Sequence, residues 1–80
     1  MPALLCERVV KVHPELTRRN QELLQLMLAG CDVPTISSRM GVQASSAATY
    51  IKRLYRKLGV NSQRELFALA MQPTWPDTLH

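Results

Sequence analysis

The stretch of sequence that decides the fold is residues 44–58, ASSAATYIKRLYRKL. Its apolar side chains recur at intervals of three and four residues, which places them on one buried face of an α-helix. These core-facing residues are Ala47, Tyr50, Ile51, Leu54 and Leu58. The opposite face carries Ser45, Thr49, Lys52 and Arg56, flanked by Ala48, Arg53 and Lys57. We therefore predict an amphipathic helix that presents small polar residues in its first half and cations in its second half.

Capping residues predict two helices before this stretch. Thr17 is a natural N-cap, because its hydroxyl can accept a hydrogen bond from a backbone N–H of the first turn, and Gly30 ends that helix. Asp32 caps a second helix, expected over residues 33–40. Gly41 then opens a tight turn into residues 44–58. The sequence thus predicts two helices joined by a short turn.

A last helix is expected to begin at Ser62, with Glu65 three residues later in a reciprocal capping box, and to end before Pro73. Three of its residues can complete the core: Leu66, Leu69 and Ala70. A second apolar stripe lies on another face, where a second copy, the leader or the tail could cover it: Phe67, Ala68 and Met71. The expected fold is all-α, with four helices.

Eighty residues are enough for one domain. We expect an N-terminal leader at 1–15, the helical domain at 16–72 and an irregular tail at 73–80. A short helix, a strand-like arm and a linker are all compatible with the leader. Cys6 and Cys31 match no zinc pattern with His13 and His80, so we expect reduced thiols, no metal and no cofactor. No apolar run is long enough for a membrane span, and a soluble cytoplasmic protein is expected.

The charge distribution favours nucleic acid as the partner. The formal net charge is +4, and the stretch from residue 33 to residue 64 holds six basic residues and no Asp or Glu. Paired carboxylates, a Cys/His dyad and a glycine-rich phosphate loop are all missing from the sequence, so we expect no enzymatic activity and no small-molecule site.

Residues 16–70 resemble the LuxR/GerE-type helix-turn-helix domain. The family opening L-T-x-R-E-x-E-[VL]-L reads LTRRNQELL at 16–24. The family ending Y-x-K-L-G-V-x-[ST]-R-x-E-L reads YRKLGVNSQREL at 55–66. Between them, Ile36, residues 40–42 and Ile51 stand where the family places its core. The resemblance implies a tri-helical core followed by a C-terminal dimerisation helix.

The resemblance further implies a bacterial transcription regulator. It would bind double-stranded DNA sequence-specifically as a homodimer, with a recognition helix at about 44–58 in the major groove. RNA polymerase is an additional candidate partner. The base-contacting residues would be Ala48, Thr49 and Lys52. Contacts to the DNA backbone would come from Ser45, Ser46, Arg53, Arg56 and Lys57. The dimer interface would contain Phe67, Ala68, Met71 and Arg64. For Ser45, capping the helix start is an equal alternative.

Several positions depart from the family pattern. Asn20 replaces the Glu of the opening motif, which should weaken the capping box there. Pro34 and Ala48 stand where the family often has Lys, so two cations are missing. These losses motivate an alternative function, a protein-interaction module that keeps the fold but has lost specific DNA reading and modulates another regulator. Arg18 and Arg19 lie at a helix start, where a nearby phosphate or a solvated surface would each explain them.

Overall fold

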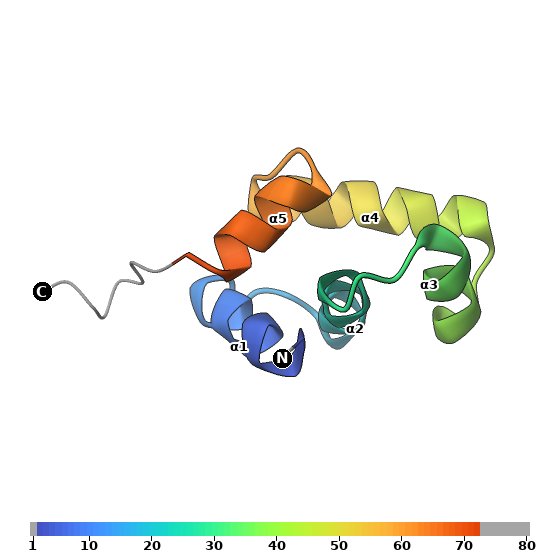
Figure 1. Ribbon diagram of the computed structural model, residues 1–80. Helices are drawn as coiled ribbons and strands as arrows, with labels where there is room; N and C mark the ends of the chain where they lie inside the picture. Colours follow the sequence, from blue (N-terminus) through green and yellow to red (C-terminus); the bar gives the residue numbers. More distant parts are fainter. Residues whose placement is uncertain (1, 73–80) are drawn as a thin grey trace, which may run out of the picture.

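The computed structural model describes residues 2–72, and this part of the chain contains helices and no strand (Figure 1). The helices are α1 (Pro2–Val12), α2 (Arg18–Leu28), α3 (Val33–Met40), α4 (Ala44–Leu58) and α5 (Gln63–Ala70). The all-α prediction is confirmed, and α2 to α5 are the four helices expected from the sequence. The leader supplies a fifth helix, α1, which is one of the three conformations left open for it. The predicted tail at 73–80 lies outside the described residues.

The start of α2 is held by a complete capping box. Thr17 Oγ1 accepts a hydrogen bond from the Asn20 backbone N–H at 3.0 Å, and Asn20 Oδ1 accepts one from the Thr17 N–H at 3.1 Å. The box forms in full with Asn20, because the amide oxygen reaches the same N–H group that a carboxylate would, and the weakening expected from the loss of Glu stays a prediction. At α3, Asp32 Oδ1 accepts from the Thr35 N–H at 3.0 Å, as its predicted capping role requires.

The start of α5 differs from the reciprocal capping box that the sequence predicts. Ser62 caps the helix, with its side chain accepting from the Glu65 N–H at 3.2 Å. The return bond is different, because Glu65 Oε1 accepts from the backbone N–H of Asn61 at 2.8 Å and not from that of Ser62. The reciprocal capping box is thus only half formed, and the glutamate satisfies the loop residue just before the cap.

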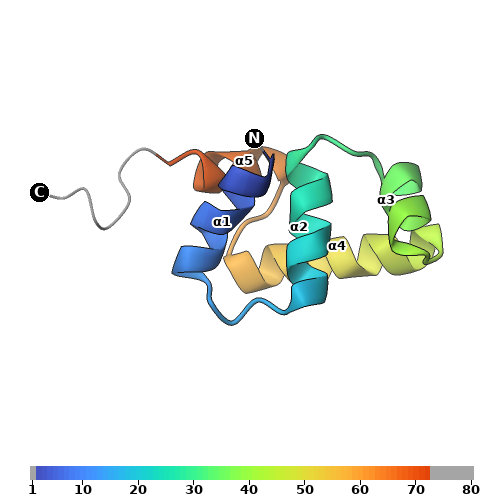
Figure 2. The same ribbon diagram turned by 90° about the horizontal axis from the view of Figure 1, so that it is seen from below.

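One hydrophobic core joins all five helices. Its fully buried large side chains are Val9, Leu23, Leu24, Ile36, Leu54 and Leu66. Figure 2 shows α1 and α2 side by side, with α2 crossing α4, and α1 also packs against α5. Because Val9 is 0% exposed, α1 contributes to the same core as the predicted domain.

The two apolar faces of α5 have different surroundings. Leu66 and Ala70 are buried and Leu69 is half-buried, as the sequence predicts for the core-facing side. On the second stripe, Phe67 is half-buried against the core, whereas Ala68 and Met71 are exposed. A further contact joins the two terminal segments, because Arg8 Nη2 donates to the backbone oxygen of Gln72 at 2.7 Å.

Candidate nucleic-acid interface

Helices α3 and α4 form the pair that positions the candidate interface. Gly41 ends α3 with φ +68°, a left-handed conformation that glycine adopts without a Cβ penalty. The Val42 N–H then donates back to the Ser37 carbonyl at 3.0 Å, which closes the end of α3. In Figure 1, α3 lies against the N-terminal end of α4. A short turn between two packed helices is the arrangement of a helix-turn-helix unit.

The buried face of α4 fixes which side points to solvent. Ala47, Leu54 and Leu58 are buried, and Tyr50 and Ile51 are half-buried, so the predicted core stripe is confirmed. The opposite face is exposed along the helix, at Ser45, Thr49, Lys52 and Arg56. Among the flanking residues, Arg53 and Lys57 are exposed and Ala48 is half-buried. The outward face of α4 is therefore the one predicted from periodicity.

The first turn of α4 has no side-chain cap. Its N-cap residue is Gln43, whose side chain makes no capping hydrogen bond, so the capping alternative for Ser45 is wrong. Instead, the Ser45 carbonyl accepts a hydrogen bond from the Thr49 hydroxyl at 3.1 Å. Since this proton is already committed, Thr49 can offer a ligand only its methyl group and its oxygen lone pairs. Ser46 is half-buried.

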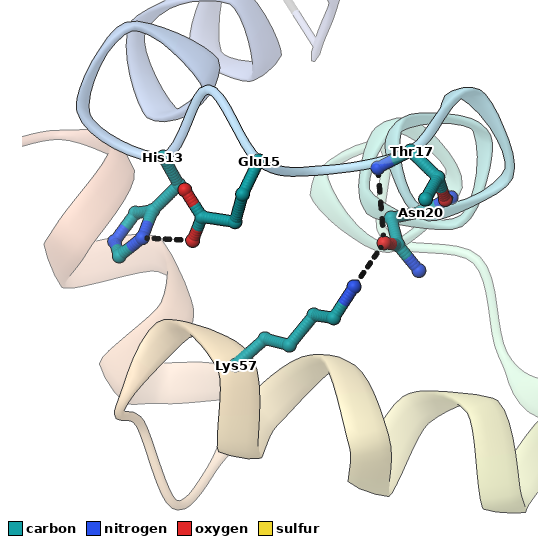
Figure 3. Close-up of polar contacts among 5 residues, drawn as sticks. All are labelled: His13, Glu15, Thr17, Asn20 and Lys57. Carbon is teal, nitrogen blue, oxygen red and sulfur yellow. Dashed lines mark hydrogen bonds and ion pairs between the residues drawn. The ribbon is translucent and has the colours of Figure 1, made fainter.

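The four cations in the second half of α4 are not equivalent. Lys57 Nζ donates to Asn20 Oδ1 at 2.9 Å, which ties the end of α4 to the start of α2 (Figure 3). Within residues 2–72, the other three cations make no hydrogen bond or ion pair: Lys52, Arg53 and Arg56. Three exposed cations of α4 thus have charges that no carboxylate in the described structure offsets.

Arg19 has a structural role that the sequence did not indicate. Its guanidinium donates to Glu22 Oε1 at 2.8 Å and to the Met40 carbonyl at 2.9 Å. The second bond places a cation at the C-terminal end of α3, where it satisfies an unpaired carbonyl and complements the helix dipole. The Glu22 partner could have been found from the three-residue spacing. The Met40 contact could not, because it depends on how α2 and α3 pack.

A hollow of about 320 Å³ lies between the start of α2, the end of α3 and the flank of α4. We call it the α2–α4 hollow. Three of its lining residues are cations and none is acidic; the lining comprises Thr17, Arg19, Asn20, Leu23, Met40, Tyr50, Arg53 and Lys57. Sequence reasoning missed this feature, since its residues come from three separate segments.

The loop before α2 carries a second polar contact of this region. His13 Nδ1 and Glu15 Oε2 lie 3.2 Å apart (Figure 3). The pKa of Glu15 is lowered, mainly by a hydrogen bond from its own backbone and then by the hydrogen bond with His13, with a smaller effect from the charge of Lys57. The carboxylate of Glu15 is therefore already engaged by His13.

The residues predicted for a dimer interface lie together on α5. Arg64, Ala68 and Met71 are exposed, and Phe67 is half-buried. Met71 retains 59% of its accessible surface, which makes it the most exposed large hydrophobic residue among those described. In residues 2–72 no helix has both the length and the apolar content that a membrane span requires.

Comparison with known proteins gives one family. The sequence pattern of the family described as "Bacterial regulatory proteins, luxR family" matches residues 14–70. The chain is 35% identical over 66 residues to the probable transcriptional regulatory protein NarL of Mycobacterium tuberculosis, a match that covers 82% of this chain and 31% of the relative. It is 33% identical over 69 residues to the transcriptional regulatory protein MctR of Rhizobium johnstonii, covering 86% and 32%. The chain spans about a third of the length of these relatives. No solved structure matches it significantly.

Proposed function

Since the chain belongs to the LuxR family of bacterial regulatory proteins, we propose that it binds double-stranded DNA sequence-specifically as a dimer and thereby regulates transcription. The coarser part of this statement, a DNA-binding transcription regulator domain, follows from the family itself. RNA polymerase is a further candidate partner, and a bacterial regulator of this kind works in the cytoplasm.

The observation that carries the proposal is the outward face of α4. It is exposed along the whole helix, follows a short turn from α3 and contains cations with no partner in residues 2–72. A helix of this kind can enter the major groove, where side chains reach base edges, while its cations meet phosphates. The absence of any acidic residue between 33 and 64 keeps this side of the molecule attractive to DNA.

The outward residues divide between base and backbone contacts. Lys52 would donate to guanine O6 or N7, and the methyl groups of Ala48 and Thr49 would contact a thymine methyl. The commitment of the Thr49 hydroxyl proton to the Ser45 carbonyl supports an apolar contact at that position. The DNA backbone would be held from the ends and flanks of the helix by Ser45, Ser46, Arg53, Arg56 and Lys57.

Two variants in α4 test this division. Lys52→Ala is expected to lower affinity for a selected site by more than affinity for random duplex, because a lost base contact costs about 1–3 kcal/mol of discrimination. Arg56→Ala is expected to weaken binding to all duplexes and to reduce the slope of log affinity against log salt by about 0.9 for each subunit. Fluorescence anisotropy titrations at several salt concentrations measure both effects, with an operator taken from selection out of a random DNA pool.

Lys11→Ala provides the control, because it removes an exposed cation of α1 with the same change in net charge. Unchanged specificity and an unchanged salt slope in both α4 variants would remove α4 from the interface. A failure of the wild-type protein to bind random duplex at micromolar concentration and low salt would contradict DNA binding as a whole, because non-specific association is measurable there.

A further inference from the structure

We propose that the α2–α4 hollow is an additional phosphate-binding site, whose ligand is a phosphodiester group of the DNA backbone beside the major groove. This inference rests on the proposed function and adds to it a contact made by α2, outside the recognition helix. It starts from the hydrogen bond that joins the two helices across the hollow, Lys57 Nζ to Asn20 Oδ1 at 2.9 Å.

The partner of Lys57 is neutral in this chain. The structure places positions 20 and 57 within hydrogen-bond distance, and this chain has an amide at the first and an ammonium at the second. A Glu at position 20 would form an ion pair across the hollow, whereas Asn20 accepts a hydrogen bond and leaves Lys57 without a carboxylate at contact distance. With Asn20 in place of a Glu, the local charge is more positive by one unit, and the capping box of α2 is still formed.

Two of the three cations that line the hollow, Arg53 and Lys57, form no ion pair in residues 2–72, and the charge of Lys57 acts on the carboxylate of Glu15 without contact. Arg19 is paired with Glu22 at 2.8 Å, and Glu15 is engaged with His13 at 3.2 Å. Arg53 has no partner in residues 2–72, and it lies four residues before Lys57 on the same helix. Like charges at this spacing repel each other, and an anion between them would relieve the repulsion.

Asn20 also supplies a donor that Glu cannot. Its Oδ1 accepts from both the Thr17 N–H and Lys57, while its Nδ2 group has no hydrogen-bond partner in the described residues and points away from both (Figure 3). An amide has two N–H donors and a carboxylate has none. The lining of the hollow thus includes an ammonium, a guanidinium without an ion pair and an amide whose N–H donors have no partner in the described residues.

The position of the hollow suits a backbone phosphate. Arg53 lies on the flank of α4, between the outward residue Lys52 and the hollow. The cations of α4 therefore extend from its outward face to the side that faces α2. A duplex whose major groove holds the outward face of α4 brings its sugar–phosphate strands to the flanks of that helix. The strand on the α2 side would then lie over Arg53, Asn20 and Lys57.

The test is Asn20→Glu, which lowers the positive charge of the hollow by one unit without threatening the fold, because Glu is a preferred residue at this position of a capping box. We expect duplex binding to lose about 0.9 from its salt slope for each subunit, equivalent to roughly a threefold smaller change in affinity between 50 and 200 mM salt. Gln25→Glu is the matched control: it also converts an exposed amide of α2 to a carboxylate, but outside the lining of the hollow. It should leave the slope unchanged.

Two outcomes separate this inference from the proposed function. If Arg56→Ala reduces the salt slope of duplex binding but Asn20→Glu leaves it as unchanged as Gln25→Glu does, the phosphate site alone is overturned. Wild-type protein that binds no duplex would overturn the proposed function. Inorganic phosphate serves as the probe for a free anion: if it saturates the amide NMR shifts of Asn20 and Lys57 at low millimolar concentration without DNA, the assignment to a backbone phosphate is wrong. Shifts produced by duplex DNA and not by millimolar phosphate would support it.

Discussion

At the scale of single residues, Thr17 orders the start of α2 through one hydroxyl group. Its Oγ1 accepts the Asn20 N–H, and its own N–H donates to Asn20 Oδ1, so two backbone donors of the loop and first turn are satisfied locally. This capping also sets where Asn20 stands relative to Lys57. A change at Thr17 should therefore affect stability directly and the α2–α4 hollow indirectly.

Thr17→Ala is expected to lower the free energy of unfolding by about 1 kcal/mol, because an N-cap hydroxyl satisfies an otherwise unpaired N–H group. Chemical denaturation followed by circular dichroism measures the change. Thr17→Ser keeps the hydroxyl and is the control, with an expected loss close to zero. Equal losses in the two variants would mean that the methyl group, and not the cap, contributes the stability.

The other N-cap of interest, Asp32, gives a pH dependence. Its pKa is lowered from the usual 3.8 by hydrogen bonds from Thr35, first from the side chain and then from the backbone N–H. A depressed carboxylate pKa stabilises the fold above the unfolded-state value, and this contribution disappears as pH falls through the lower, folded-state value. The cap therefore contributes at neutral pH and is lost in acid.

We expect the stability difference between the wild type and Asp32→Asn to be constant above about pH 5 and to shrink below about pH 4, since Asn caps the helix without titrating. Thermal unfolding across the acid and neutral range measures this difference, and carboxyl NMR shifts give the pKa directly. A folded-state pKa at or above 3.8 would contradict the hydrogen-bonded cap.

The burial of some residues could be predicted from the sequence, whereas the partners of others could not. The buried and outward faces of α4 follow from helical periodicity, which is local, and the structure confirms them. The partners of Arg19 and Lys57 lie 21 and 37 residues away, so they depend on how helices pack. Arg19 and Lys57 each stand next to another cation in the sequence, but Arg19 binds the last carbonyl of α3, whereas Lys57 joins α4 to α2.

At the scale of elements, α1 is the helix that the sequence left undecided. Its three valines, Val9, Val10 and Val12, are weak helix formers, so local propensity did not favour a helix over an extended arm. Short helices gain most of their stability from the face that they bury. Here that face packs on α2 and α5, which lie outside residues 1–15 and could not be anticipated from them.

Two valines of α1 test whether it belongs to the folded domain. Val9 is 0% exposed and Val12 is 42% exposed. Val9→Ala is expected to cost about 2 kcal/mol of unfolding free energy, because it removes buried methyl groups and leaves a cavity. Val12→Ala makes the same chemical change at the exposed end of the helix and should have an effect below about 0.5 kcal/mol. Denaturant titration measures both losses of unfolding free energy. Equal losses for Val9→Ala and Val12→Ala would show that α1 is an independent arm.

At the scale of the whole molecule, the outward face of α4 and the exposed apolar residues Ala68 and Met71 occupy different helices. Lys52, Arg53 and Arg56, which have no partner in residues 2–72, belong to α4, whereas Ala68 and Met71 belong to α5 and its C-terminal end. This separation allows one surface to contact DNA while another contacts a second copy. Two-fold pairing through α5 would present two recognition helices to half-sites about one DNA turn apart.

Ala68→Glu tests this arrangement in one substitution. The charge would be placed in the centre of the proposed interface and would meet its own symmetry mate, so we expect the dimer to dissociate. The monomer should keep its stability, because the new carboxylate would lie four residues after Arg64 on an exposed helix face, where the opposite charges attract. Sedimentation equilibrium measures the mass, and Gln25→Glu controls for the added charge.

DNA binding should follow the change in assembly. A dimer engages two half-sites with the second contact made intramolecular, so Ala68→Glu should weaken binding to a two-half-site duplex by at least about tenfold and leave binding to a single half-site nearly unchanged. A variant that remains dimeric, with unaltered binding to both duplexes, would move the interface away from α5. In that case the exposed Leu4 of α1, which retains 55% of its accessible surface, becomes the next position to substitute, because α1 packs beside α5.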